Sequence, residues 1–234
     1  MDVLKRCHYD PTKDRLICLG DFVDGSERVK DCLEYLSEQP NIEPIFGNHD
    51  KWFLDWVQTG EDPDPWWLYN GGPVTLKSYN YYAGNARSEQ AKYECAMLRY
   101  CPDSRIPRKH VEFIRNARLY YETDNWVAMH GGFRPEVGFK KENPENIMWD
   151  RDLFYQHWQK LPKDHKLVIV GHTPTMAVTG IPEPIFRYKT FGKDKKLMLI
   201  NIDTGGKIGS ALCVLNPDTL EWWTSKKETN PKNW

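Results

Sequence analysis

Six residues that can bind a metal ion or transfer a proton follow four short apolar segments. The segments cover residues 16–19, 42–46, 126–129 and 167–170, and each leads into a turn that contains glycine. The six residues are Asp21, Asp24, Asn48, His49, His130 and His172. Their oxygen and nitrogen donors suit manganese, iron or zinc. A single aspartate or histidine in such a turn is usually structural, but four such turns on converging strands indicate a metal site.

The four apolar segments are predicted to be buried strands of an α/β fold. Between the first two, residues 26–38 carry apolar side chains at helical spacing, with Ser26 placed as the N-cap. Strand, helix and strand make a βαβ unit, whose strands run parallel. The carboxyl ends of parallel strands share one edge of the sheet, where α/β proteins bind ligands. The four turns are therefore expected to lie together.

The middle of the chain, residues 51–118, is polar and rich in tryptophan and tyrosine, and we expect it to be a helical cap insertion. Helices are predicted near residues 88–99 and 107–116. The cluster Trp52, Trp56, Trp66 and Trp67 either packs a helical segment or lines a pocket wall, and packing is the expected role. Past Ile185, four segments are predicted to form antiparallel strands: 186–189, 196–202, 211–215 and 220–224.

Composition limits the classes of partner. The 234 residues include 32 basic and 33 acidic side chains, for a formal net charge of −1. No global positive field attracts nucleic acid or anionic lipid, so neither is an expected partner. The longest apolar segments are far shorter than the roughly 20 residues that span a bilayer, and the N-terminus does not resemble a secretory signal. A cytoplasmic location is expected. The six cysteines lack the close pairs that bind zinc and are expected to be reduced.

Four motifs, in order and spacing, resemble those of the calcineurin-like metallophosphoesterases: Gly20-Asp21-Phe22-Val23-Asp24, Gly47-Asn48-His49-Asp50, His130-Gly131-Gly132 and Gly171-His172-Thr173. Within that superfamily the chain is most similar to the bacterial and phage serine/threonine protein phosphatases and the symmetrical diadenosine tetraphosphatases. Asn70-Gly71-Gly72, Trp149-Asp150-Arg151-Asp152 and residues 201–205 also resemble segments of that branch. The resemblance implies a single α/β domain over residues 1–234. Its fold would be a sandwich of two mixed β-sheets flanked by helices, with the first strand missing.

The resemblance also implies roles for seven residues. Asp21 would bridge two divalent cations, and Asn48, His130 and His172 would complete the second metal site. Manganese is the expected metal, with iron or zinc as alternatives, and two cations about 3.5 to 4 Å apart would clamp the phosphoryl oxygens. His49 would protonate the leaving group while Asp24 orients its ring. Arg151 would bind the substrate phosphate through its guanidinium fork, or would only make a surface ion pair with its aspartate neighbours.

The sequence departs from the family at three points. No Asp-x-His, which supplies two ligands to the first metal, precedes Asp21. We expect the chain to begin inside the family domain, so that only the second metal site is intact and activity is reduced; the alternative is that His8 and Asp10 replace the lost ligands. Gly25 stands where the branch carries a phosphate-binding arginine, for which Arg28 or Lys30 are candidate substitutes. Asp50 replaces a glutamate.

The expected function is metal-dependent hydrolysis of phosphate monoesters, with a serine/threonine phosphoprotein or a small phosphoester as substrate. One alternative is hydrolysis of dinucleoside tetraphosphates, in which the tryptophans would stack on purines. Another is a degenerate phosphoesterase that serves as a binding module. His110, His157 and His165 are expected on the surface, and Asp203 is expected to be a turn residue.

Overall fold

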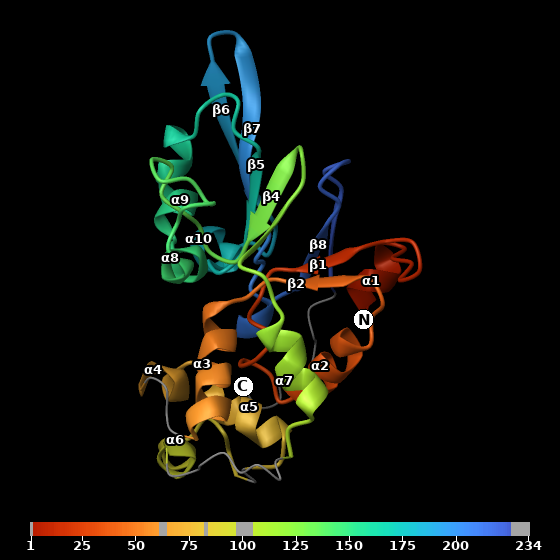
Figure 1. Ribbon diagram of the computed structural model, residues 1–234, viewed down its shortest axis with the longest axis vertical. Helices are drawn as coiled ribbons and strands as arrows, with labels where there is room; N and C mark the ends of the chain where they lie inside the picture. The colour runs from red at the N-terminus through yellow and green to blue at the C-terminus, as the bar shows by residue number, and fades with distance from the viewer. Residues whose placement is uncertain (1, 61–64, 82–83, 97–104, 226–234) are drawn as a thin grey trace.

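The computed structural model describes residues 2–60, 65–81, 84–96 and 105–225 (Figure 1). Its central element is a five-stranded mixed sheet in the order β3 (Tyr120–Glu122), β4 (Trp126–Met129), β5 (Leu167–Val170), β7 (Asp194–Asn201) and β6 (Ile185–Phe191). Strands β4, β5 and β7 run parallel, while β3 and β6 pair antiparallel at the two edges. Two of the predicted strands, 126–129 and 167–170, are confirmed to the residue.

Strands β4 and β5 are buried on both faces, which explains why these two strands are apolar without interruption. Val127 and Val168 pack on one face beneath α8 (Pro144–Trp149) and α9 (Asp152–Tyr155). Trp126 and Ile169 alternate with them and pack on the opposite face. Three short helices follow later in the chain: η1 (His157–Lys160), α10 (Thr175–Thr179) and η2 (Gly206–Ile208).

Two smaller sheets accompany the central one. Strands β1 (Leu16–Cys18) and β2 (Ile42–Pro44) run parallel and are joined by α2 (Val29–Ser37), as the βαβ pattern predicted. Strands β8 (Cys213–Leu215) and β9 (Trp222–Thr224) pair antiparallel next to α1 (Asp2–Arg6). The mixed α/β class with a central mixed sheet flanked by helices is confirmed. The predicted N-cap is wrong: α2 begins at Val29, because the Ser26 hydroxyl accepts the Arg28 N–H in a turn before the helix.

Below the strands in Figure 1, further helices lie beside α2. They are α3 (Asn48–Thr59), α4 (Pro65–Tyr69), α5 (Gly72–Ser78), α6 (Glu89–Ala96) and α7 (Arg108–Arg115). Helices α6 and α7 match the two that were expected, although residues 97–99 lie outside the described residues. Among the described residues, no helix is long and apolar enough to cross a membrane. The single domain and the bounds of its cap insertion, 51–118, stay a prediction.

The aromatic residues of the insertion form much of a second core. Trp56 and Trp67 are almost fully buried there, together with Phe53 and Tyr79. His110, expected on the surface, is buried as well, because Tyr79 and Glu34 satisfy its two ring nitrogens. Trp52 belongs to the same core, so the packing role expected for the tryptophans holds for three of the four.

A buried carboxylate, Glu142, organises the loop between β4 and α8. It accepts hydrogen bonds from the backbone and guanidinium of Arg134, the N–H of Asn143 and the amide of Asn146. These contacts, those of Arg134 first, lower the pKa of Glu142 to about 2. A depressed carboxyl pKa stabilises the fold above the unfolded-state value near 4.5 and loses that contribution as the pH falls toward the folded-state value.

Glu142→Gln is therefore expected to lower the free energy of unfolding by about 2 kcal/mol at neutral pH. Since the wild-type carboxylate becomes protonated in acid, the difference between the two proteins should narrow as the pH falls below about 4.5. Urea unfolding at several pH values measures it, with the exposed Glu136→Gln from the same loop as control. A difference that stays constant with pH would contradict the assignment.

Candidate active site

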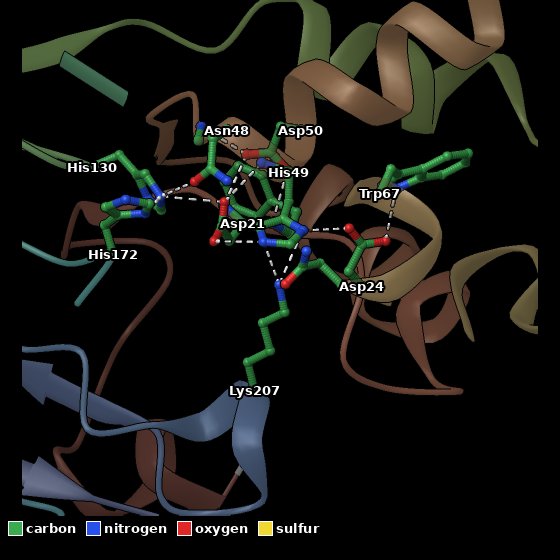
Figure 2. A network of polar contacts seen from close by, with 12 residues as sticks. Asp21, Asp24, Asn48, His49, Asp50, Trp67, His130, His172 and Lys207 are labelled. Atoms are coloured by element: carbon green, nitrogen blue, oxygen red, sulfur yellow. Dashed lines mark hydrogen bonds and ion pairs between the residues drawn. The ribbon is translucent and has the colours of Figure 1, made fainter. Parts of the chain in front are cut away.

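The structure brings together all six of the residues that follow the apolar segments (Figure 2). Asp21 and Asp24 lie in the turn after β1, His130 directly follows β4, and His172 lies in the turn after β5. Asn48 and His49 were expected in a loop, but they form the first turn of α3. The turns meet because β1 and β2 run parallel, as do β4 and β5, so that within each pair both strands end at the same edge.

Four donor atoms converge at the centre of the site. His130 Nε2 lies 3.0 Å from Asn48 Oδ1, 3.3 Å from Asp21 Oδ1 and 3.2 Å from His172 Nδ1. Donor atoms bound at about 2.1 Å to one cation are separated from each other by similar distances. Asp21, His130 and His172 form the group of possible metal ligands found among the described residues.

The position of the proton on the His130 ring indicates that these donors fit a cation. Its Nδ1 lies 2.5 Å from the carbonyl oxygen of Leu19 and donates to it, so the neutral ring carries no proton on Nε2. That unprotonated nitrogen faces the acceptor oxygens of Asn48 and Asp21. These electron-rich atoms repel one another, and a positive ion between them removes the repulsion. A ring N–H donated to a backbone carbonyl is also the usual way in which proteins orient a metal-binding histidine.

His172 is held in the form that binds metals. Burial, followed by the nearby His130 and Arg151, lowers the pKa of His172 to about 2, so its imidazole is neutral at physiological pH. Its Nε2 is buried without a hydrogen-bond partner. A neutral imidazole is the form that ligates a metal ion. Two imidazole nitrogens, an amide oxygen and a carboxylate oxygen form a donor set that manganese, iron and zinc all accept.

The backbone of the site is strained where the functional side chains attach. Asp21, Asp24 and His172 have φ values of 56°, 67° and 62°, in the left-handed region that side chains other than glycine seldom adopt. Such conformations cost of order 1 to 3 kcal/mol each and cluster at functional sites. Half of the six non-glycine residues with positive φ in the described part of the chain belong to this site.

Asp50 holds the strained turn in place. Its carboxylate accepts the N–H groups of Asp21, Phe22 and Gly47 at 2.8 to 2.9 Å. Burial, and then the carboxylate of Asp21, raises the pKa of Asp50. Gly47 is required here because a Cβ would lie 2.6 Å from the Asp21 nitrogen and would overlap its carboxylate. Asp50 thus joins the turn after β1 to the start of α3.

His49 and Asp24 form a buried pair beside the donor cluster. His49 Nδ1 lies 2.5 Å from Asp24 Oδ2, and His49 Nε2 lies 4.0 Å from Asp21 Oδ2. The other oxygen of Asp24 accepts from the Thr75 hydroxyl at 2.6 Å and from the Trp67 indole at 3.3 Å. With its carboxylate held on both sides, Asp24 fixes the orientation of the His49 ring and leaves Nε2 to face the site.

A pocket of about 310 Å³ opens beside these residues and is mainly aromatic. Its lining residues are Asn48, His49, Trp52, Trp66, Asn70, Trp149 and Arg151. Trp52 packs edge-on against both His49 and Trp149, at centroid distances of 4.9 and 5.2 Å. The pocket role considered for the tryptophan cluster therefore applies to Trp52 and Trp66. Trp52 is buried in the core as well, whereas Trp66 is exposed.

Arg151 lies at this pocket rather than in a surface ion pair. Its Nη1 donates to the carbonyl oxygen of His172 at 2.7 Å and lies 3.2 Å from the Thr173 hydroxyl. None of the ion pairs among the described residues joins it to Asp150 or Asp152. The predicted phosphate-binding arginine is therefore attached to the loop that carries a predicted metal ligand.

Other candidates serve structural roles. Asp10 accepts from the N–H and hydroxyl of Thr12 within its own turn, and neither it nor His8 belongs to the metal-ligand group of the described residues. Asp203 likewise accepts the Gly205 N–H in a turn. Arg28, a candidate substitute for the missing arginine, pairs with Asp31 on the surface.

Three contributors were missed from the sequence: Thr75, Trp67 and Lys207. The Asn70-Gly71-Gly72 motif was a signal for Thr75, since it leads into α5, which carries that residue. Lys207 approaches both ring nitrogens of His49, at 3.0 Å from Nδ1 and 2.5 Å from Nε2. No local sequence pattern predicted this contact of Lys207.

The chain is similar in sequence to known proteins. A model of the calcineurin-like phosphoesterases matches residues 1–200. The chain is 26% identical over 175 residues to serine/threonine-protein phosphatase 1 of Salmonella typhimurium, which covers 74% of this chain and 72% of that protein.

Solved structures show the same fold at low identity. A candidate diadenosine tetraphosphatase superposes with a TM-score of 0.62 at 12% identity, over 97% of this chain and 86% of that one. A metallophosphoesterase from Sphaerobacter thermophilus gives a TM-score of 0.51 at 15% identity, over 97% and 82% of the two chains. These similarities extend over the whole described fold.

Proposed function

The chain belongs to the calcineurin-like phosphoesterase family, and from this premise we propose that it is a metal-dependent phosphatase acting on phosphate monoesters, with serine/threonine phosphoproteins as the preferred substrates. The observation that carries the proposal is the convergence of Asp21, Asn48, His130 and His172 on one point next to the His49–Asp24 pair. A donor set for a cation beside an oriented proton donor is what phosphate-ester hydrolysis needs.

One divalent cation would be held by these four residues, and manganese is the metal we propose. When bound, it would act as a Lewis acid that polarises the phosphoryl group and offsets its charge. The second cation of the resemblance has no comparable donor set in the described part of the chain, so the proposal assigns it no role. Burial raises the pKa of Asp21, but the surrounding basic groups, His130 first, outweigh it and hold that pKa below its ordinary value. Asp21 is therefore ionised, as a ligand must be.

The remaining residues act directly on the substrate. His49 would donate a proton from Nε2 to the leaving oxygen, because Asp24 occupies its Nδ1. Arg151, fixed at the pocket by the His172 carbonyl, would bind phosphoryl oxygens from the pocket side. Both residues line the same pocket, so a phosphate there lies within reach of both.

The relative from Salmonella typhimurium supports a phosphoserine or phosphothreonine substrate, since its name states that activity. A specific observation favours the alternative of a dinucleoside tetraphosphate. Three tryptophans line the pocket beside His49 and Arg151, and an aromatic wall of this kind can stack on a purine base. The fold similarity to a candidate diadenosine tetraphosphatase agrees with either substrate.

The test compares manganese-loaded and chelator-stripped chain on three substrates: p-nitrophenyl phosphate, a phosphoserine peptide and diadenosine tetraphosphate. Metal-dependent hydrolysis of the first two is expected. Turnover of the dinucleotide in preference to the peptide would replace the proposed substrate with the alternative. A loaded chain that turns over none of the three would be a binding module rather than a phosphatase.

A further inference from the structure

Lys207 brings a positive charge into the site from a distant part of the chain. It lies in η2, in the loop that leaves β7, and is 158 positions from His49 in the sequence. Its Nζ lies 2.5 Å from His49 Nε2, the nitrogen that faces the site. Figure 2 shows the side chain extended toward the cluster from below.

Gly25 makes the room that Lys207 occupies. A Cβ at position 25 would overlap Lys207 Cγ and lie 3.3 Å from its Cβ. Gly25 also has a φ of +80°, which side chains seldom adopt. Any larger residue at position 25 would therefore displace the lysine from His49, so the two positions are structurally coupled.

Carboxylates surround the place that Lys207 occupies. The carboxylates of Asp21 and Asp24 lie beside the His49 ring, and their negative charge repels a phosphoryl anion. Arg28 does not reach it, because its side chain is 75% exposed and pairs with Asp31. Arg151 lies by the His172 loop, whereas Lys207 lies against Gly25.

We propose that Lys207 binds the phosphoryl group of the substrate, so that it supplies from the loop after β7 the positive charge that Gly25 cannot. This inference rests on the proposed phosphatase function. An ammonium group carries three N–H donors. On arrival of the phosphate these hydrogens would turn from the His49 ring to the phosphoryl oxygens, which leaves Nε2 facing the leaving group.

The experiment measures binding of inorganic phosphate to the manganese-loaded chain by isothermal titration calorimetry. Lys207→Met is expected to weaken phosphate binding by about 10- to 100-fold, the range for a lost hydrogen bond to a charged group. Lys207→Arg should retain most of the affinity, and Lys193→Met, on the exposed β6–β7 turn, should bind as the wild type does. Elemental analysis of each protein checks that its metal content is unchanged.

Gly25→Ala supplies a second, independent variant. It should weaken phosphate binding when Lys207 is present and change it little in the Lys207→Met background, because the added methyl acts by displacing the lysine. Equal effects in the two backgrounds would overturn the coupling and the proposal with it.

The outcomes separate this inference from the proposed function. A wild-type chain that neither binds phosphate nor hydrolyses p-nitrophenyl phosphate overturns both. A wild type that does both, with unchanged phosphate affinity in Lys207→Met, overturns the role of Lys207 alone. If the variant binds phosphate normally and takes up an additional manganese ion, the lysine replaces a cation instead of binding substrate, and the proposal also fails.

Discussion

His130→Ala is expected to remove the bound cation and to reduce hydrolysis to the background rate. His130 Nε2 is the atom on which the other three donors converge, and its Nδ1 fixes the ring to the backbone of the turn after β1. Losing a residue that only supports a metal ligand typically costs 10- to 100-fold in metal affinity, so losing the ligand itself should cost at least about 100-fold. Without the cation, several kcal/mol of charge stabilisation disappear from the transition state.

Manganese binding by calorimetry and the number of ions per chain by elemental analysis measure the first effect directly. Far-UV circular dichroism of the metal-free proteins shows whether the variant is folded. His8→Ala is the matched control, because His8 is exposed and was the alternative candidate for a replaced ligand. If His8→Ala lost the metal and His130→Ala kept it, the donor set would be the wrong one.

The sequence predicted the strands that carry the site because their signal is local. An apolar run of four or five residues that stops at glycine and a polar residue marks a buried strand and its end, and residues 126–129 and 167–170 were found in this way. Asn48 and His49 were placed correctly next to β2 but in the wrong element. Nothing in a short polar motif distinguishes a loop from the first turn of a helix that begins at once.

The missed residues depend on contacts between distant positions. Thr75 and Trp67 reach Asp24 across 51 and 43 positions, and Lys207 reaches His49 across 158. A hydrogen bond of this kind leaves no periodicity and no spacing to recognise. The sequence shows that position 25 lacks the arginine of the family branch that the chain resembles. Only the structure shows that a lysine, Lys207, fills the space beside Gly25.

The strained turns also depend on contacts between distant positions, so the sequence could not predict them. Aspartate and histidine do not by themselves predict a positive φ, and Asp21 adopts one because Asp50, 29 positions away, accepts its N–H. Preorganisation of the candidate ligands is thus a property of the packed fold. The sequence names the donors, and the tertiary contacts set the separations of about 3 Å that let four donors share one ion.

His49→Gln is expected to lower kcat for a phosphoserine peptide by about 10²- to 10⁴-fold without loss of the metal, the range for removal of a general acid. The expected loss is much smaller for p-nitrophenyl phosphate, because a nitrophenolate leaves readily without a proton whereas a serine alkoxide does not. Asp24→Asn should show the same dependence on the leaving group, more weakly, since it disturbs only the orientation of the ring.

The ratio of the two losses is the decisive measurement, because it separates proton donation from a merely structural role. A His49→Gln variant that loses the same factor with both substrates, at unchanged manganese content, would contradict general acid catalysis by His49. It would instead place the residue with those that position the phosphate. Because His49 Nε2 contacts Lys207, the same ratio should also be measured for Lys207→Met, to distinguish phosphate binding from proton donation. Loss of phosphate binding should slow both substrates by the same factor. Loss of the proton donor should slow the phosphoserine peptide more than p-nitrophenyl phosphate.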